Sequence, residues 1–298
     1  MRPRQAAVRR PTTPTVRSAT GYTSYIGYAQ ELAKAANRAK TEIRELILGR
    51  LPYNTSSTHD EALKEVETVL FYDLKYLLFI SPAILLAFLA QALVMSAYGR
   101  GKRIPARTSG ADAARRILDS AGLTDVGIEQ VGGVMSDHYD PTARVLRLSP
   151  EVYHGESLTA VGIAAHEAGH ALQHAQGYLA LGLRNMAVPL ANFGSGIGMV
   201  LLLIGIGLHL KALALVGLVL FGSVAAFQII NLPVEFNASS RAKAELVGLG
   251  IVSNHDMGPV NRVLNAAALT YVAATLQSIL SVLYYASYVF GGSSSRDE

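Results

Sequence analysis

The sequence predicts a mainly α-helical membrane protein, in which four transmembrane helices carry a smaller α+β lobe at the membrane surface. Charged residues make up only 16% of the 298 residues, whereas soluble domains usually contain about 25%. Four stretches of the chain are uncharged and apolar, and each is long enough to cross a bilayer, which takes about 20 helical residues. The polar segments between these stretches contain strand-like and helix-like patterns, which predicts the lobe.

The N-terminal region differs in composition from the rest of the chain. Residues 1–30 contain several arginines and no acidic residue, and the first acidic side chain is Glu31. This composition fits an organelle transit peptide and equally fits a disordered basic tail. Residues 31–75 predict an amphipathic helical extension, with a loop at residues 51–60 where Pro, Asn, Ser and Thr gather.

The apolar stretches predict four transmembrane spans. They cover residues 76–98, 186–210, 212–230 and 264–290. Only Lys211 separates the second span from the third, which predicts a tight hairpin. Glycines are frequent in the second span and favour close helix packing in lipid. A soluble helical hairpin buried within protein is the alternative for the second and third spans.

Two polar segments, residues 99–185 and 231–263, are expected to form the lobe together. Two crossings separate them, and an even number of crossings returns the chain to the same side of the membrane. Four basic residues directly follow the first span, namely Arg100, Lys102, Arg103 and Arg107. The positive-inside bias therefore places the lobe in the cytosol or its organelle equivalent.

Short elements are predicted within the first polar segment. Residues 108–120 predict a helix that Gly122 ends, and residues 126–131 predict a strand. Residues 144–148 alternate polar and apolar side chains, as a half-exposed strand does. Ser157 is suited to cap a helix that extends to Gln176.

The pentapeptide His166-Glu167-Ala168-Gly169-His170 lies inside this last helix. Histidines four residues apart share one helix face, so both rings can bind one Zn²⁺ ion. Glu167 between them is assigned as the general base that takes a proton from water. Because the chain has no cysteine, a transition-metal site must use His, Asp or Glu. The lobe is therefore predicted to be a zincin-like metallopeptidase unit. Gly169 lies inside the predicted helix, where glycine is unfavourable. It indicates either that the site needs another group close to the helix backbone or that a second helix packs there.

A catalytic zinc site needs a third protein ligand. Glu235 is the expected third ligand, early on a new helix that begins near Pro233. The alternative for Glu235 is a partner of the helix dipole. His174 is a rival ligand, but eight residues of helix separate it from His166, which is about 12 Å along the axis.

Further side chains are expected to support this site. His138 and Asp140 lie in a polar cluster that ends at Pro141, and the cluster is either an ordinary turn or a group that orients ligands or stabilises the transition state. A protease must also hold an extended substrate. The strand before the motif helix is expected to be the sheet edge that pairs with the substrate backbone, through Arg144, Val145, Leu146, Arg147 and Leu148.

Several segments together resemble the YugP-like neutral zinc metallopeptidases, a family of multi-pass membrane proteins. These segments are Asp137–Pro141, Arg144–Leu148, Ala164–His174, Leu232–Ser239 and Leu264–Ala273. The resemblance covers roughly residues 70–290. It implies zinc peptidase activity with Zn²⁺ as the cofactor and names no substrate.

The chain is more distantly similar to HtpX-like membrane proteases, whose third zinc ligand opens a Glu-x-x-Ala-Asp motif. Glu235 and Ala238 match this motif, and Ser239 stands in place of the aspartate. The side chain that supports one histidine therefore differs from the HtpX-like pattern. Asn237 and Ser239 join His174 among the residues expected close to the ligands.

The expected function is that of an integral membrane zinc endopeptidase, which cleaves unfolded or membrane-protein substrates at the cytosolic, stromal or matrix surface. The partners are a polypeptide and the lipid bilayer of a bacterial-type plasma membrane or an organelle, and no nucleic-acid-binding module is found. One alternative is intramembrane cleavage, although the Leu-Asp-Gly motif of that class does not occur. Another is a scaffold or transporter with a structural metal site.

Overall fold

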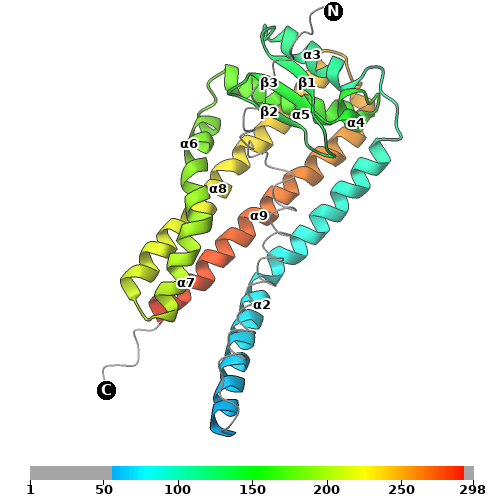
Figure 1. Cartoon of the computed structure of the whole chain (residues 1–298). Helices are drawn as coiled ribbons and strands as arrows, with labels where there is room; N and C mark the ends of the chain where they lie inside the picture. Colours follow the sequence, from blue (N-terminus) through cyan, green and yellow to red (C-terminus); the bar gives the residue numbers. More distant parts are fainter. Residues whose placement is uncertain (1–55, 292–298) are drawn as a thin grey trace, which may run out of the picture. The chain divides into compact units, whose positions relative to one another are not determined.

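The structure is a computed structural model that describes the backbone of residues 56–291 and the side chains of residues 74–291. The predictions for residues 1–30, and for the extension up to residue 55, lie outside the described residues. The described part is mainly helical, with a small sheet (Figure 1). Its elements are α2 (Ser56–Gly101), α3 (Gly110–Ser120), β1 (Gly127–Gln130), β2 (His138–Asp140), β3 (Val145–Leu148), α4 (Pro150–Tyr153), α5 (Leu158–Ala175), α6 (Leu179–Phe193), the π-helix η1 (Gly194–Gly198), α7 (Met199–Gly207), α8 (Lys211–Gly248), the 3₁₀ turn η2 (Asn254–Asp256) and α9 (Met257–Gly291).

Four helical segments in the described part are long and apolar enough to cross a membrane, as the sequence predicted. They are Leu74–Gly101, Leu179–Gly207, Lys211–Gly248 and Asn254–Gly291, with mean hydropathies from 1.6 to 2.4 in their most apolar windows. Large apolar side chains on these helices point outward, among them Phe88 (72% exposed) and Met186 (78% exposed). Lipid solvates such side chains far better than water does. Only 22% and 28% of the second and third windows are buried, which argues against a hairpin buried within protein.

The second and third spans pack against each other through glycines. Gly194, Gly198 and Gly205 each lie so close to α8 that an added Cβ would overlap its atoms, and Gly217 of α8 lies equally close to α7. Small residues allow helix backbones to approach, which strengthens packing where no hydrophobic effect drives helices together. The glycines of the second span therefore allow close helix packing, as the sequence predicted.

Two predicted boundaries are wrong. Residues 56–60 belong to α2 and are not part of a loop. The third span does not end before a new helix at Pro233, because α8 continues through this proline to Gly248. Proline inside a helix removes one backbone hydrogen bond and costs about 3 kcal/mol. Packing of α8 against α6 before the proline, at Ser223, and against α5 after it, at Ala238, offsets this cost. Glu235 is thus in the middle of a long helix.

The sheet has three strands in the order β1-β3-β2, with β1 parallel and β2 antiparallel to β3. Strand β3 is therefore central, and the prediction that residues 144–148 form an edge for substrate is wrong. The alternation of polar and apolar residues in 144–148 predicts which face of the strand is buried, and Leu146 and Leu148 are indeed buried. The alternation does not predict which strands lie on either side. Arg144 lies before the strand, with a φ of 52°.

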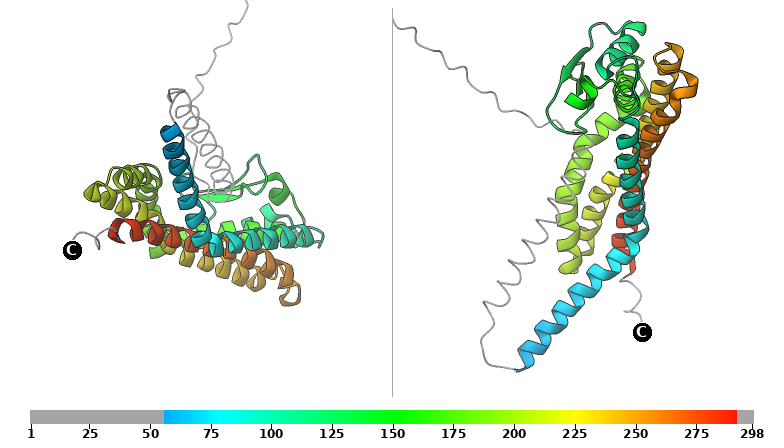
Figure 2. Two further views of the ribbon diagram at one scale, coloured as in Figure 1. Left: turned by 90° about the horizontal axis from the view of Figure 1, so that it is seen from below. Right: turned by 90° about the vertical axis from the view of Figure 1, so that its right-hand side faces the viewer.

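The sheet and the short helices α3, α4 and α5 gather at one end of the long helices (Figure 2). Helix α5 is the centre of this lobe: its apolar side packs with α3, the sheet and the ends of α8 and α9 in one buried cluster, which includes Ile117, Leu146, Val161, Leu246 and Val260. The segment predicted as a second lobe part, residues 231–263, consists of the end of α8, the turn η2 and the start of α9. The long helices thus extend beyond their apolar stretches into the lobe.

Candidate metal centre

Helix α5 presents the two histidines of the pentapeptide on one face. Ser157 caps the helix by accepting a hydrogen bond from the backbone N–H of Ala160 (3.2 Å), and Gly177 follows its end with a φ of 62°. Between these ends, His166 and His170 stand one turn apart, with ring centroids 4.8 Å from each other. This is the geometry that the i, i+4 spacing predicted.

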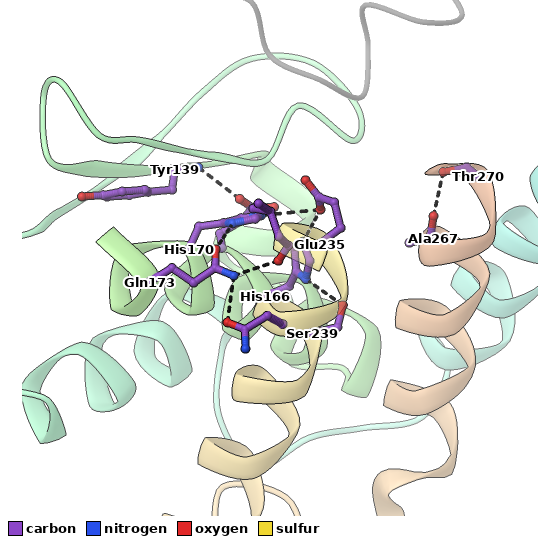
Figure 3. Close-up of polar contacts among 11 residues, drawn as sticks. Tyr139, His166, His170, Gln173, Glu235, Ser239, Ala267 and Thr270 are labelled. Atoms are coloured by element: carbon purple, nitrogen blue, oxygen red, sulfur yellow. Dashed lines mark hydrogen bonds and ion pairs between the residues drawn. The ribbon is translucent and has the colours of Figure 1, made fainter. Parts of the chain in front are cut away.

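Glu235 of α8 meets both histidines (Figure 3). Its Oε2 atom lies 3.3 Å from His166 Nε2 and 3.6 Å from His170 Nε2. One ligand atom from each of the three residues lies within 4.8 Å of the others, and all three side chains are largely buried. Ligand atoms from α5 and from α8, which are distant in sequence, therefore lie close enough together to bind one metal ion.

The chemistry of these atoms fits zinc. Glu235 Oε2 is buried and makes no well-formed hydrogen bond; it faces the two imidazole nitrogens at 3.3 and 3.6 Å, and a buried carboxylate oxygen needs such compensation. Two imidazole nitrogens face the same point, and a divalent cation there would satisfy all three groups at once. Two histidines and one glutamate are a ligand set of catalytic zinc sites, which keep the fourth position open.

Glu167 lies beside the three ligand residues. The backbone N–H of Tyr139 on β2 donates to its Oε2 atom at 3.0 Å. Burial raises the pKa of the Glu167 carboxyl to about 7, and the negative charges of Asp137 and Glu235 act in the same direction. A pKa near neutrality suits a group that accepts and returns a proton during a reaction.

The sequence relationships agree with this geometry. A family model described as "Putative neutral zinc metallopeptidase" matches residues 76–290. The chain belongs to this family. A relative described as "Putative membrane protease YugP", from Bacillus subtilis (strain 168), is 48% identical over 215 residues, which cover 72% of this chain and 94% of the relative. No solved structure matches the chain.

Each of the two histidines has a polar partner on its Nδ1 atom. His166 Nδ1 lies 3.1 Å from Ser239 Oγ, and His170 Nδ1 lies 2.9 Å from Gln173 Oε1. Asn237 contacts Gln173 and thereby reaches the centre indirectly. Ser239 and Asn237 were among the residues expected from the sequence, whereas Gln173 was not. Its position three residues after His170, on the same face of the helix, was the available signal.

His138 and Asp140 are not in the group of described residues that could hold a metal ion. Side chains alternate along a strand, so His138 and Asp140 of β2 point away from the face that carries Tyr139. Asp140 instead accepts hydrogen bonds from Arg147 and from the backbone of the following turn. His138 Nδ1 lies 2.8 Å from the backbone oxygen of Ser136. The contacts of Asp140 fit the turn interpretation, whereas the supporting role of His138 stays a prediction, because its Nε2 atom is buried without a hydrogen-bond partner.

His174 is not a rival ligand. Its Nδ1 atom lies 2.8 Å from the hydroxyl of Tyr139, one turn of α5 beyond His170. Tyr139 and Asp137 belong to this neighbourhood; the sequence placed both in a polar cluster with His138 but assigned them no role. Asp137 directly precedes β2 and Tyr139 lies within it, and their place beside the centre follows only from the packing of β2 against α5.

Gly169 allows the metal-binding helices to meet. A Cβ atom at this position would lie 2.6 Å from the backbone oxygen of Ala238 in α8. The two helices therefore approach backbone to backbone at the level of the ligands. The two interpretations that the sequence offered for Gly169, a close backbone approach and helix packing, coincide in this contact.

We expect Gly169→Ala to force α5 and α8 apart, and thereby to weaken both the fold and zinc binding. Overpacking typically costs about 1–3 kcal/mol, which outweighs the gain of about 1 kcal/mol in helix propensity. Thermal unfolding and zinc titration measure the two effects. Gly248→Ala is the matched control, because a Cβ at Gly248 meets nothing within 4 Å. Unchanged stability and zinc affinity in Gly169→Ala would contradict the expectation.

Proposed function

We propose that this chain is an integral membrane zinc endopeptidase that hydrolyses peptide bonds at the membrane surface. The observation that carries the proposal is the convergence of His166, His170 and Glu235 beside the buried Glu167. A motif helix packed on a small sheet, with the third ligand supplied by a later helix, supports a zincin-like lobe.

The chain's own residues account for the proton transfers of this reaction. Zinc held by the three ligand residues supplies Lewis acidity toward water and a peptide carbonyl. The Glu167 carboxylate accepts a proton from the attacking water and then delivers it to the amine that leaves. Its buried position beside β2 keeps the carboxylate in place and excludes bulk water.

The position of the site along α8 supports substrates close to the membrane. The apolar stretch of α8 ends at Ile230, and Glu235 follows five residues later. At 1.5 Å per helical residue, the site lies about 8 Å beyond the apolar stretch. The proposed substrates are unfolded polypeptides and segments of membrane proteins that emerge from the bilayer. The basic residues that follow the first span favour a cytosolic lobe, or its organelle equivalent.

The outer edge of β2 is the proposed place for the substrate backbone. Tyr139 directs its backbone N–H away from β3 and toward Glu167, so the open side of β2 faces the metal centre. An extended peptide added along this edge would pass beside the ligands. Such an edge reads the backbone of a substrate and requires little side-chain specificity.

The intramembrane alternative is not favoured. Helix α5, which carries both histidines and Glu167, is not among the four candidate spans in the described part of the chain. It is buried in the lobe against α3 and the sheet. A transmembrane substrate would have to leave the bilayer to reach these residues.

Removal of zinc is expected to abolish cleavage of a labelled unfolded casein by the purified protein in liposomes. Loss of activity after treatment with phenanthroline, and its recovery with Zn²⁺ but not with Mg²⁺, would support the proposal, because two histidines and one carboxylate do not form a magnesium site. Fluorescence release measures the cleavage. Activity that survives complete removal of the metal would reject a zinc peptidase.

A further inference from the structure

Gln173 connects the metal-binding face of α5 to α8, and its side chain is fully buried (0% exposed). We infer that Gln173 is a positioning residue for the metal. It holds the proton of His170 on Nδ1, and it secures α8 beside Glu235. This inference rests on the proposed zinc function, because it assigns a role in holding the same ion.

The orientation of the Gln173 amide follows from its partners. Its Nε2 atom lies 2.8 Å from the backbone oxygen of Val234 and 3.0 Å from Asn237 Oδ1. A backbone carbonyl only accepts hydrogen bonds, so the NH₂ group must face Val234. Arg241 only donates, and its Nε atom lies 2.7 Å from the same Asn237 Oδ1, so this oxygen is also an acceptor. Gln173 Oε1 is thereby left to face His170 (Figure 3).

This orientation determines the tautomer of His170. An amide oxygen accepts and never donates, so the contact of 2.9 Å between Gln173 Oε1 and His170 Nδ1 requires the proton on Nδ1. The lone pair of the neutral ring is then on Nε2, the atom that faces Glu235 at 3.6 Å. A metal ligand needs this unprotonated nitrogen, and the bond on the other nitrogen selects it.

Gln173 also contacts the backbone of α8 one residue after Pro233. Pro233 has no N–H, so α8 lacks one backbone hydrogen bond in this turn. The Val234 carbonyl that Gln173 binds belongs to the residue directly before Glu235. One side chain of α5 thus touches a ligand on its own helix and the backbone beside the ligand on the other helix. The distance between His170 and Glu235 depends on both contacts.

His166 lacks such a partner. Ser239 Oγ lies 3.1 Å from its Nδ1 atom, and a hydroxyl rotates and both donates and accepts. A serine therefore does not select one tautomer of the ring. We expect the loss of the Gln173 side chain to weaken metal binding more than the loss of the Ser239 hydroxyl.

The test is Gln173→Met, which keeps the length of the side chain and removes its hydrogen bonds. Loss of a polar group that supports a metal ligand typically lowers metal affinity about 10- to 100-fold. Competition with a chromophoric chelator measures the zinc affinity of the purified full chain, and the absorption spectrum of the Co²⁺ form reports the coordination geometry. We expect weaker zinc binding and a changed cobalt spectrum in Gln173→Met, with a smaller loss of affinity in Ser239→Ala.

Gln176→Met is the matched control. It makes the same chemical change three residues later, where the amide oxygen accepts a hydrogen bond from Arg241 and does not touch His170. We expect wild-type zinc affinity in this control. If Gln173→Met does not fold, Gln173→Asn keeps the amide but is one methylene too short to reach both His170 and Val234. It should show the same loss.

The outcomes separate this inference from the proposed function. Wild-type protein that binds no zinc would overturn both. Wild-type protein that binds zinc, together with a folded Gln173→Met or Gln173→Asn variant of equal affinity and unchanged cobalt spectrum, would overturn the positioning role alone. Equal losses in Gln173→Met and Gln176→Met would also overturn it, because the effect would then not depend on contact with His170.

Discussion

Glu167→Gln is expected to abolish proteolysis while zinc remains bound. The amide cannot accept a proton from water, and loss of a general base typically lowers the rate about 10²- to 10⁴-fold. The substitution hardly changes the size of the side chain, and an amide oxygen can still accept the hydrogen bond from the Tyr139 N–H. Metal content and the rate of casein cleavage, measured on the same preparation, test both parts.

The control for this variant is Glu156→Gln, which changes an exposed glutamate before α5 and should leave cleavage unchanged. Substantial activity in Glu167→Gln would remove Glu167 from the role of the base. Loss of zinc from Glu167→Gln would instead show that this carboxylate helps to hold the metal.

Glu235→Ala is expected to remove zinc from the protein, and activity with it. The three ligand atoms come from two helices, and without Glu235 only the pair on α5 remains. The loss of affinity should exceed the roughly 10- to 100-fold effect that is typical for a residue that merely supports a ligand. Metal analysis after dialysis against a weak chelator measures the zinc that remains.

The stability of the metal-free Glu235→Ala variant distinguishes loss of a zinc ligand from misfolding. Glu235→Ala also removes the contacts of Glu235 Oε2 with the two histidine rings at 3.3 and 3.6 Å. Thermal unfolding of the metal-free variant and the metal-free wild type therefore shows whether the variant is folded. Glu245→Ala makes the same change later on α8 and should retain zinc. Unchanged zinc stoichiometry in Glu235→Ala would contradict the proposed centre, because His166, His170 and Glu235 are the one such group of three found among the described residues.

The two variants test different properties of the site. Glu167→Gln tests the cleavage reaction while zinc binding is kept, and Glu235→Ala tests zinc binding itself. A protein with a purely structural metal site would lose zinc in the second variant but would show no cleavage to lose in the first. The pair therefore distinguishes a peptidase from a scaffold.

Local chemistry made part of this site predictable. The spacing of His166 and His170 determines that both rings share one face of any helix that contains them. Ser157 and Gly177 mark the ends of α5 by capping and by a positive φ. The choice of Glu235 rested on the motif's demand for a third ligand, and the structure places its carboxylate against both histidines.

The predictions that failed concern relations between neighbours. The pattern of residues 144–148 identified a strand but placed it at an edge, although β1 and β2 occupy both of its sides. The proline at position 233 suggested a helix start, but α8 continues because it is packed on both sides of the proline. Asp140 resembled a site residue because it lies in a polar cluster with His138, but its carboxylate accepts hydrogen bonds from Arg147 and from the backbone of the following turn.

The amino-acid sequence by itself determined the four apolar spans, the helix that carries the histidine pair, and the kind of metal chemistry that a chain without cysteine can support. These features depend on side-chain type and on periodicity along one segment. Only the tertiary structure decided which carboxylate oxygen faces the histidines, which strand is exposed at the edge, and that Gln173 links α5 to α8. These features depend on the distance between segments that are far apart in the chain, and packing of the whole lobe sets that distance.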